Sequence, residues 1–150
     1  MDVKTGVIRG SLSLDKIVEE VTRVSVELGG GAVVCFVGFV KGLVDDKKVF
    51  RLDYTAYEPY ASRKLEEIAR EEAARYKLLA VRVYHRIGEL KPGEPTIYIV
   101  VVSRSREEAF EGARSILERV KREAPIFKLE RREDGDYWII GDRGRVKRSR

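Results

Sequence analysis

The spacing of apolar residues along the chain predicts three amphipathic helices. In three segments apolar residues recur every three or four positions, so that they gather on one face of a helix. These segments are residues 14–28, 59–76 and 105–120. Ser13 is a suitable N-cap for the first helix, and Pro59 fits a first-turn position of the second. Ser105 and Glu108 have the spacing of a capping box at the start of the third helix, which Pro125 ends.

Between these helices the apolar pattern predicts three pairs of strands. The pairs are residues 32–40 with 48–57, 80–87 with 96–102, and 126–131 with 137–140. Alternation in the second strand predicts one shared face, made of Phe50, Leu52, Tyr54 and Ala56. A loop at residues 42–47 can close the first pair into a hairpin, and Asp134-Gly135 is a strong turn signal for the last pair.

The order of the predicted elements is helix, strand, strand, three times over. It predicts an α+β fold with a mainly antiparallel sheet. We expect one domain over residues 1–140 and a basic C-terminal tail over residues 141–150.

The chain has 150 residues and a formal net charge of +5, and most of that charge lies in the tail. The tail holds Asp142 and five cations, which are Arg143, Arg145, Lys147, Arg148 and Arg150. The other 140 residues hold 25 basic and 24 acidic side chains, so the body is nearly neutral. The tail is therefore either a frayed, solvated end or an arm that attracts anions or contacts a partner.

A small basic nucleic-acid-binding α+β module is the alternative function that this charge suggests. Such a module would explain the basic tail. However, the body lacks an excess of positive charge, and no strand has the aromatic-rich pattern of an RNA-recognition motif.

The counts of cysteine and histidine exclude several classes of site. With one cysteine, Cys35, and one histidine, His85, neither an internal disulfide framework nor a Cys/His zinc site can form. Cys35 lies within an apolar strand, where we expect a small buried hydrophobic residue with an unreactive thiol. No signal peptide or membrane-spanning run is evident, so a reducing cytoplasm is the expected location.

His85 and Arg86 end a predicted strand immediately before Gly88. Strand alternation places His85 on the face of Val81 and Val83, and Arg86 on the opposite face. A histidine on an apolar face is commonly a satisfied core residue. A strand end beside a glycine turn is also a place where a side chain reaches a pocket, so both interpretations stand.

Lys121 and Lys128 lie on either side of a turn at Pro125. Lys121 falls in the last turn of the third helix and Lys128 in the strand that follows. A lysine at a helix end is commonly a favourable partner of the helix dipole. Two lysines brought together could instead clamp an anion, and neighbouring cations lower each other's pKa, which favours a base or a nucleophile.

These same segments resemble the large, catalytic subunit of molybdopterin synthase. The similar blocks occur in order from about residue 32 to residue 138. They are Phe36–Lys41, Tyr57–Ala61, His85–Leu90 with Pro92–Glu94, Arg106 with Ala109–Phe110, Lys121–Glu130, Asp134–Gly135 and Trp138. No single block is specific, whereas the ordered set is.

The resemblance implies a fold and a reaction. The fold is an α/β hammerhead, and the reaction installs the two sulfurs of the molybdopterin dithiolene on cyclic pyranopterin monophosphate. The sulfur donor is a C-terminal Gly-Gly thiocarboxylate of a small ubiquitin-like partner, whose tail enters a pocket on the large subunit. A homodimer of large subunits forms the centre of a heterotetramer. The reaction requires no metal and no bound cofactor, and neither a membrane nor a nucleic acid is an expected partner.

The resemblance also assigns residues. The catalytic residues would be Lys121 and Lys128, and the substrate-binding residues would be Phe39, Val40, Lys41, His85, Arg86, Leu129 and Glu130. An arginine near Arg143 would reach the site of the neighbouring subunit. Two positions depart from the family pattern: Lys41 stands where arginine is usual and loses the bidentate fork, and Ser105 stands where histidine is frequent.

Overall fold

Two sheets joined along the chain form the fold, which is described from a computed structural model covering residues 1–140 and 144–148. The helices are α1 (Leu14–Ser25), the short 3₁₀ helix η1 (Val26–Leu28), α2 (Tyr60–Arg75) and α3 (Arg106–Glu123). The strands are β1 (Asp2–Ile8), β2 (Ala32–Phe39), β3 (Leu43–Val44), β4 (Lys47–Ala56), β5 (Ala80–Arg86), β6 (Gly88–Leu90), β7 (Pro95–Ser103), β8 (Ile126–Arg132), β9 (Gly135–Ile140) and β10 (Gly144–Lys147).

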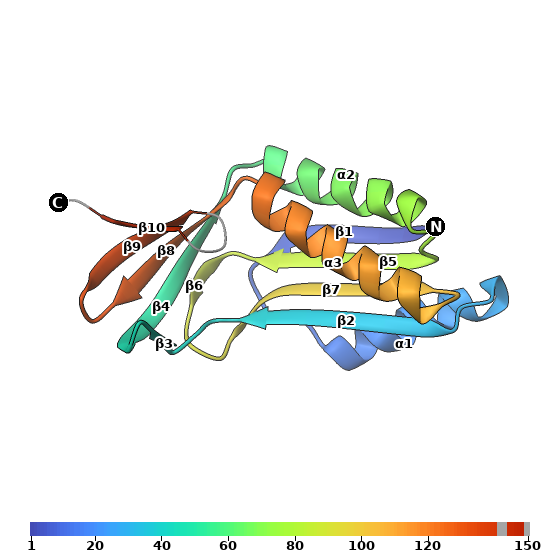
Figure 1. Ribbon diagram of the computed structural model, residues 1–150, viewed down its shortest axis with the longest axis horizontal. Helices are drawn as coiled ribbons and strands as arrows, with labels where there is room; N and C mark the ends of the chain where they lie inside the picture. The colour runs from blue at the N-terminus through green and yellow to red at the C-terminus, as the bar shows by residue number, and fades with distance from the viewer. Residues whose placement is uncertain (141–143, 149–150) are drawn as a thin grey trace.

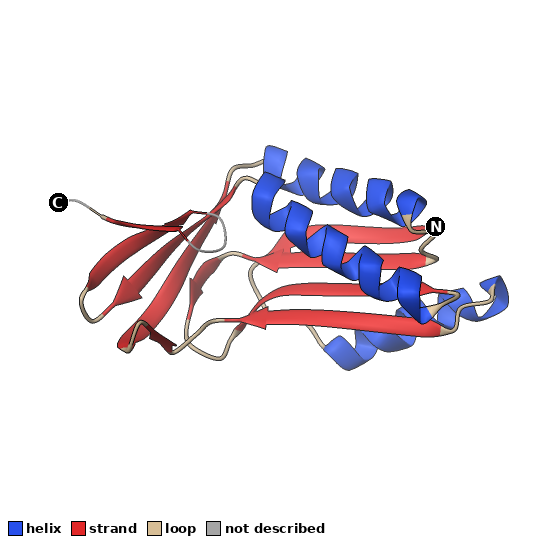
Figure 2. Ribbon diagram, viewed as in Figure 1, coloured by secondary structure: helices blue, strands red, loops and turns tan. Residues whose placement is uncertain are grey.

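The first sheet has the strand order β1-β5-β7-β2 and is covered by helices on both faces (Figures 1 and 2). The apolar stripes of α2 and α3 pack on one face, where they bury Leu65, Ile68 and Ile116 against β5 and β7. On the other face α1 packs Val21 against Val100 and its neighbours. The strands are buried from both sides, which explains the nearly continuous apolar run of β7.

The second sheet has the order β10-β9-β8-β4-β3, and β6 also pairs with β4. It lies at one end of the molecule, beyond the ends of β2 and β5 (Figure 1). Its own core consists of Val40, Val44, Val49, Leu52, Tyr54 and Leu90. In both sheets the described pairs are antiparallel except β1 with β5, so the predicted α+β class with mainly antiparallel sheet is confirmed.

The helix ends agree with the sequence signals in part. Ser13 is the N-cap of α1, and its side chain accepts a hydrogen bond from the Lys16 backbone N–H at 3.4 Å. Pro59 occupies the N-cap of α2 rather than its first turn. Ser105 is the N-cap of α3 but makes no capping bond through its side chain, so the capping box expected with Glu108 does not form.

The hairpin predicted between residues 32–40 and 48–57 is wrong. β2 pairs with β7 in the first sheet, whereas β4 pairs with β3, β6 and β8 in the second. The connection between them therefore crosses from one sheet to the other. The shared face predicted for β4 is also interrupted, because its register with β8 shifts between Val49 and Arg51. As a result Val49 is buried and Phe50 is 58% exposed.

Cys35 is exposed, which corrects the expectation of a buried thiol. The apolar stripe of α1 lies over β5 and β7 and does not extend across β2, the edge strand. The face of β2 that carries Val33 and Cys35 is consequently open to solvent. Neighbouring atoms still remove part of the water around the thiol, and this desolvation raises the pKa of Cys35.

The structure adds strands that the apolar pattern did not indicate. β1 runs parallel to β5 at the edge of the first sheet. Gly144–Lys147 of the basic tail forms β10, paired with β9, so this part of the tail is not a frayed end. Residues 141–143, including Arg143, and residues 149–150 lie outside the described residues. No helix in the described part of the chain is long and apolar enough to cross a membrane.

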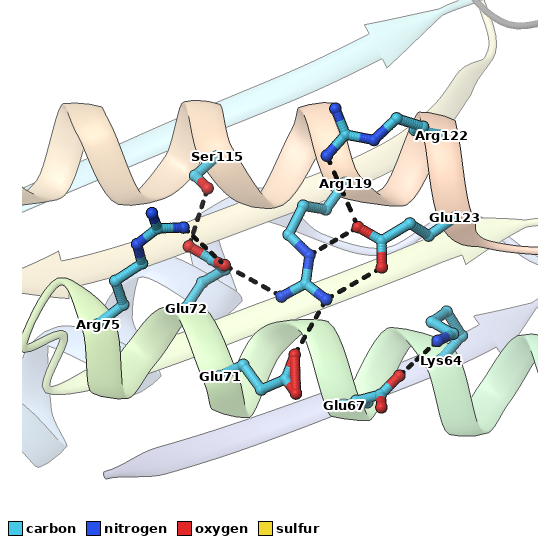
Figure 3. Close-up of polar contacts among 9 residues, drawn as sticks. All are labelled: Lys64, Glu67, Glu71, Glu72, Arg75, Ser115, Arg119, Arg122 and Glu123. Atoms are coloured by element: carbon cyan, nitrogen blue, oxygen red, sulfur yellow. Dashed lines mark hydrogen bonds and ion pairs between the residues drawn. The ribbon is translucent and has the colours of Figure 1, made fainter.

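A cluster of hydrogen bonds and ion pairs joins α2 to α3 near the end of α3 (Figure 3). Arg119 of α3 donates a 3.0 Å hydrogen bond to Glu72 of α2, which is 2% exposed, and it also pairs with Glu123 on its own helix. Ser115 donates a second hydrogen bond to Glu72, at 2.8 Å. The cluster fixes the last turns of α3, which carry Lys121 two residues after Arg119.

Candidate active site

A pocket of about 190 Å³ lies where the two sheets meet, and it gathers most of the predicted site residues. Its walls come from β2, β5 and β7 of the first sheet, the end of α3, and β4, β8, β9 and β10 of the second sheet. Its polar and ionisable lining residues are Lys41, Tyr54, His85, Thr96, Lys121, Lys128, Glu130 and Arg145. Phe36, Phe39, Ile97 and Ile126 supply apolar wall.

Lys121 and Lys128 reach the pocket from two different elements. Lys121 lies in the last turn of α3, as the sequence predicts, and Lys128 lies on β8, opposite Tyr54 of β4. The Lys128 ammonium stands 5.9 Å from the centre of the Tyr54 ring, a cation–π distance. With Lys41 from the segment after β2, three lysines converge on one cavity, which suits an anionic ligand.

His85 enters the pocket at the end of β5 and is 8% exposed. Its Nδ1 lies 2.8 Å from the Arg86 carbonyl oxygen. Because a carbonyl only accepts, Nδ1 carries the proton and Nε2 of the neutral ring is an acceptor. The pKa of His85 is lowered to about 4, mainly by burial and also by the charges of Lys128 and Lys121, while the hydrogen bond to Arg86 acts in the opposite direction. His85 is therefore neutral near pH 7.

Tyr54 forms the floor between the two sheets. It is 6% exposed and packs edge to face against His85. The pKa of Tyr54 is raised to about 12, mainly by burial and also by the charge of Glu130, while a hydrogen bond with Thr96 acts in the opposite direction. The phenol thus stays protonated and can act only as a neutral hydrogen-bonding group.

Glu130 is the acidic residue among the described lining residues, and its carboxylate accepts hydrogen bonds from an arginine. Arg145 of β10 donates from Nε to one carboxylate oxygen at 3.0 Å and from Nη2 to the other at 3.4 Å. Glu130 itself is 2% exposed. The tail strand therefore contributes directly to the pocket wall.

Three predicted residues lie outside the pocket lining. Val40 is buried in the core of the second sheet, and Leu129 points to the face of β8 opposite Lys128. Arg86 points away from His85, as alternation predicts, and donates to the backbone carbonyls of Arg9 and Pro95. A role of these three residues in substrate binding stays a prediction.

Comparison with known proteins places this geometry in a family. The family described as MoaE protein matches residues 7–123. The chain belongs to the MoaE family. A relative from Pyrococcus abyssi, named molybdopterin synthase catalytic subunit, is 37% identical over 126 residues, which cover 84% of this chain and 85% of that protein. A relative of the same name from Bacillus subtilis is 38% identical and covers 73% of this chain and 69% of its own length.

Solved structures agree with the MoaE assignment. The molybdopterin synthase structure from Staphylococcus aureus superposes with a TM-score of 0.77 at 30% identity, covering 89% of this chain and 94% of that one. The MoaE protein from Burkholderia ambifaria gives a TM-score of 0.75 at 27% identity, covering 95% and 92%. The expected fold is thereby confirmed.

The MoaE pocket contains residues that the sequence did not single out. Tyr54 and Thr96 were assigned only to strands, and Arg145 only to a basic tail. The alternation of β4 placed Tyr54 on the same face as Leu52, which also lines the pocket, so that signal was available. Arg145 had no such signal, because the pairing of β10 with β9 brings it to the site. Within the described residues, no group of three or more His, Cys, Asp and Glu side chains is placed to hold a metal.

Proposed function

We propose that this chain is the catalytic subunit of a molybdopterin synthase. It transfers sulfur from the C-terminal thiocarboxylate of a small ubiquitin-like partner to cyclic pyranopterin monophosphate, which becomes the molybdopterin dithiolene. The observation that carries the proposal is the pocket, in a chain of the MoaE family, where Lys41, Lys121 and Lys128 converge beside a neutral His85.

The charges of the pocket suit the two reactants. A phosphate and a thiocarboxylate are both anions, and convergent ammonium groups bind them and stabilise negative charge that develops during sulfur transfer. Lys121, at the end of α3, acts on the pterin directly as a base or as a covalent nucleophile. Lys128 supplies mainly electrostatic stabilisation from β8.

The neutral groups of the pocket orient the pterin. His85 presents Nε2 as an acceptor, which can receive a hydrogen bond from an N–H or O–H group of the pterin. Phe39, 65% exposed at the mouth of the pocket, offers an apolar surface to the ring system or to the partner's tail. Val40, Leu129 and Arg86, which lie outside the pocket lining, remain predicted substrate-binding residues.

The assembly follows from the same proposal. The partner is a small subunit with a C-terminal Gly-Gly, and two copies of this chain form the centre of a heterotetramer in the cytoplasm. The relatives' name, catalytic subunit, supports an assembly with a further subunit. A nucleic-acid-binding module has no support from the relatives, and Arg145 of the tail is engaged with Glu130 within the fold.

Incubation with a thiocarboxylated small partner and cyclic pyranopterin monophosphate tests the function. Mass spectrometry should detect the dithiolene product only when chain, partner and pterin are all present. The chain with the pterin and free sulfide should give no product at a comparable rate, because the partner is the sulfur donor. Equal rates with sulfide, or no product with the complete mixture, would refute the proposal.

A further inference from the structure

Arg145 occupies a place in the pocket that its position in the tail does not suggest. In register it lies opposite Ile139 of β9, and Ile139 lies opposite Lys128 of β8. The arginine thus reaches over β9 toward the carboxylate of Glu130. Its two hydrogen bonds, one to each oxygen, form a bidentate pair with a nearly fully buried acid.

Glu130 has a second arginine nearby, but that arginine is engaged elsewhere. Arg132 Nη1 stands 3.7 Å from Glu130 and has no hydrogen-bond partner, while Nε and Nη2 of Arg132 donate to Asp134. Arg132 therefore adds positive charge near the acid without orienting it. The fork that fixes both oxygens of Glu130 comes from Arg145.

The balance of charge in the pocket depends on this pair. The described lining residues include four cations, which are Lys41, Lys121, Lys128 and Arg145, and one acid, Glu130. With His85 neutral, the formal charge of the wall is +3. Loss of Arg145 alone lowers it to +2 and leaves a buried carboxylate without its bidentate partner, facing a cavity that must accept an anion.

We propose that Arg145 is a positioning residue of the anion pocket. It holds the Glu130 carboxylate against the wall and offsets its charge, and it acts on the bound anion through Glu130 rather than by touching the anion itself. The inference rests on the proposed function only in requiring that the pocket bind an anion.

Inorganic phosphate is a suitable probe, because its binding can be followed by NMR titration without sulfur transfer. The proteins compared are the wild type, Arg145→Gln, Arg145→Lys and the double variant Glu130→Gln/Arg145→Gln. Arg148→Gln is the matched control, since it removes one exposed charge just after β10, at a residue outside the pocket lining. Circular dichroism melts check that each variant folds.

Arg145→Gln should weaken phosphate binding at least about ten-fold by loss of the offsetting charge. The double variant restores the wall to +3 and should return to within about three-fold of the wild type. Arg145→Lys should lie between them, because lysine keeps the charge and loses the fork. Arg148→Gln should bind as the wild type does.

A double variant as weak as Arg145→Gln would overturn the inference, because Arg145 would then contact the anion directly. Wild-type affinity in Arg145→Gln, or equal weakening in Arg148→Gln, would also overturn it. If Arg145→Gln does not fold, phosphate binding by the double variant and by Arg145→Lys still tests the inference. Both should fold, since neither leaves the Glu130 carboxylate unpaired. The two proposals can fail separately. If the wild type transfers sulfur but the double variant does not recover phosphate binding, the proposed function stands and only the role of Arg145 is refuted.

Discussion

The ring of Tyr54 meets the ring of His85 edge to face, with centroids 5.1 Å apart and planes inclined at 61°. The contact joins β4 of the second sheet to β5 of the first, at the floor of the pocket. Burial moves the two pKa values apart, to about 12 for Tyr54 and about 4 for His85. Both rings are neutral between these limits, so the charge of the pocket belongs to its lysines, Arg145 and Glu130.

The low pKa of His85 can be measured directly, because it is the only histidine of the chain. An NMR titration of the imidazole carbon-bound protons should show a midpoint near pH 4 in the folded protein. Unfolding in urea should return the midpoint to about 6.5. A folded-state midpoint near 6.5 would contradict the proposed neutral acceptor.

The same shift predicts a pH dependence of stability. The pKa of His85 is about 4 in the folded chain and 6.5 unperturbed, so protons bind preferentially to the unfolded state. The stabilisation is complete above pH 6.5 and is lost as the pH falls through 4, with a total of about 3 kcal/mol. Urea unfolding at pH 7 and pH 4 should show this loss in the wild type and not in His85→Gln. Equal pH dependence in both proteins would contradict it.

The two lysines should differ in kinetic effect. We expect Lys121→Ala to abolish single-turnover sulfur transfer while the fold and the complex with the small partner persist. Lys128→Ala should retain more activity, because Lys41 and Lys121 partly replace its charge. Gel filtration of each complex separates a chemical defect from a loss of assembly. Near wild-type turnover in Lys121→Ala, or a clearly larger defect in Lys128→Ala, would reverse the assigned roles.

Substitution of Cys35 should have little effect. The thiol is exposed on β2 and does not line the pocket, so Cys35→Ser should keep sulfur transfer within about two-fold and stability within about 0.5 kcal/mol. Because desolvation raises the pKa of the thiol, alkylation by iodoacetamide at pH 7 should be slower than for a free cysteine. Abolished turnover in folded Cys35→Ser would instead identify Cys35 as a sulfur carrier.

The polar cluster between α2 and α3 should contribute measurably to stability. Arg119→Ala removes the hydrogen-bonded arginine of the buried Glu72 and leaves that carboxylate the longer, 3.7 Å ion pair with Arg75, so we expect a loss of about 2–3 kcal/mol in urea unfolding. Arg114→Ala is the matched control on the same helix, since its pair with Glu118 is exposed and should contribute less than about 0.5 kcal/mol. Similar losses in the two variants would show that the cluster is no stronger than a surface pair.

Local sequence signals predicted the elements that carry the site. The positions of Lys121 and Lys128 follow from a helix end, a proline and the next strand, all within eight residues. Alternation alone put His85 and Arg86 on opposite faces. These features depend on residues that are close together in the sequence, so they can be predicted from the sequence alone.

Other features depend on contacts between distant segments and could not be read locally. The loop at residues 42–47 would suit a hairpin, but the chain instead changes sheets after β2. The exposure of Cys35 depends on how far α1 extends across the sheet, and the bulge that exposes Phe50 arises where β4 pairs with β8. Arg145 reaches the pocket only after three strands have paired side by side.

Because the pocket lies at the junction of the two sheets, an anion bound there should stabilise the sheets against separation. The first sheet has its core around Ile99 and the second around Leu52, and the pocket is where their walls face each other. An anion held by Lys121 on one side and Lys128 on the other is a non-covalent crosslink between the two layers. Its binding free energy opposes their separation, by about 2.7 kcal/mol at a ligand concentration one hundred times Kd. Substrate thus adds rigidity at the place where the fold is divided.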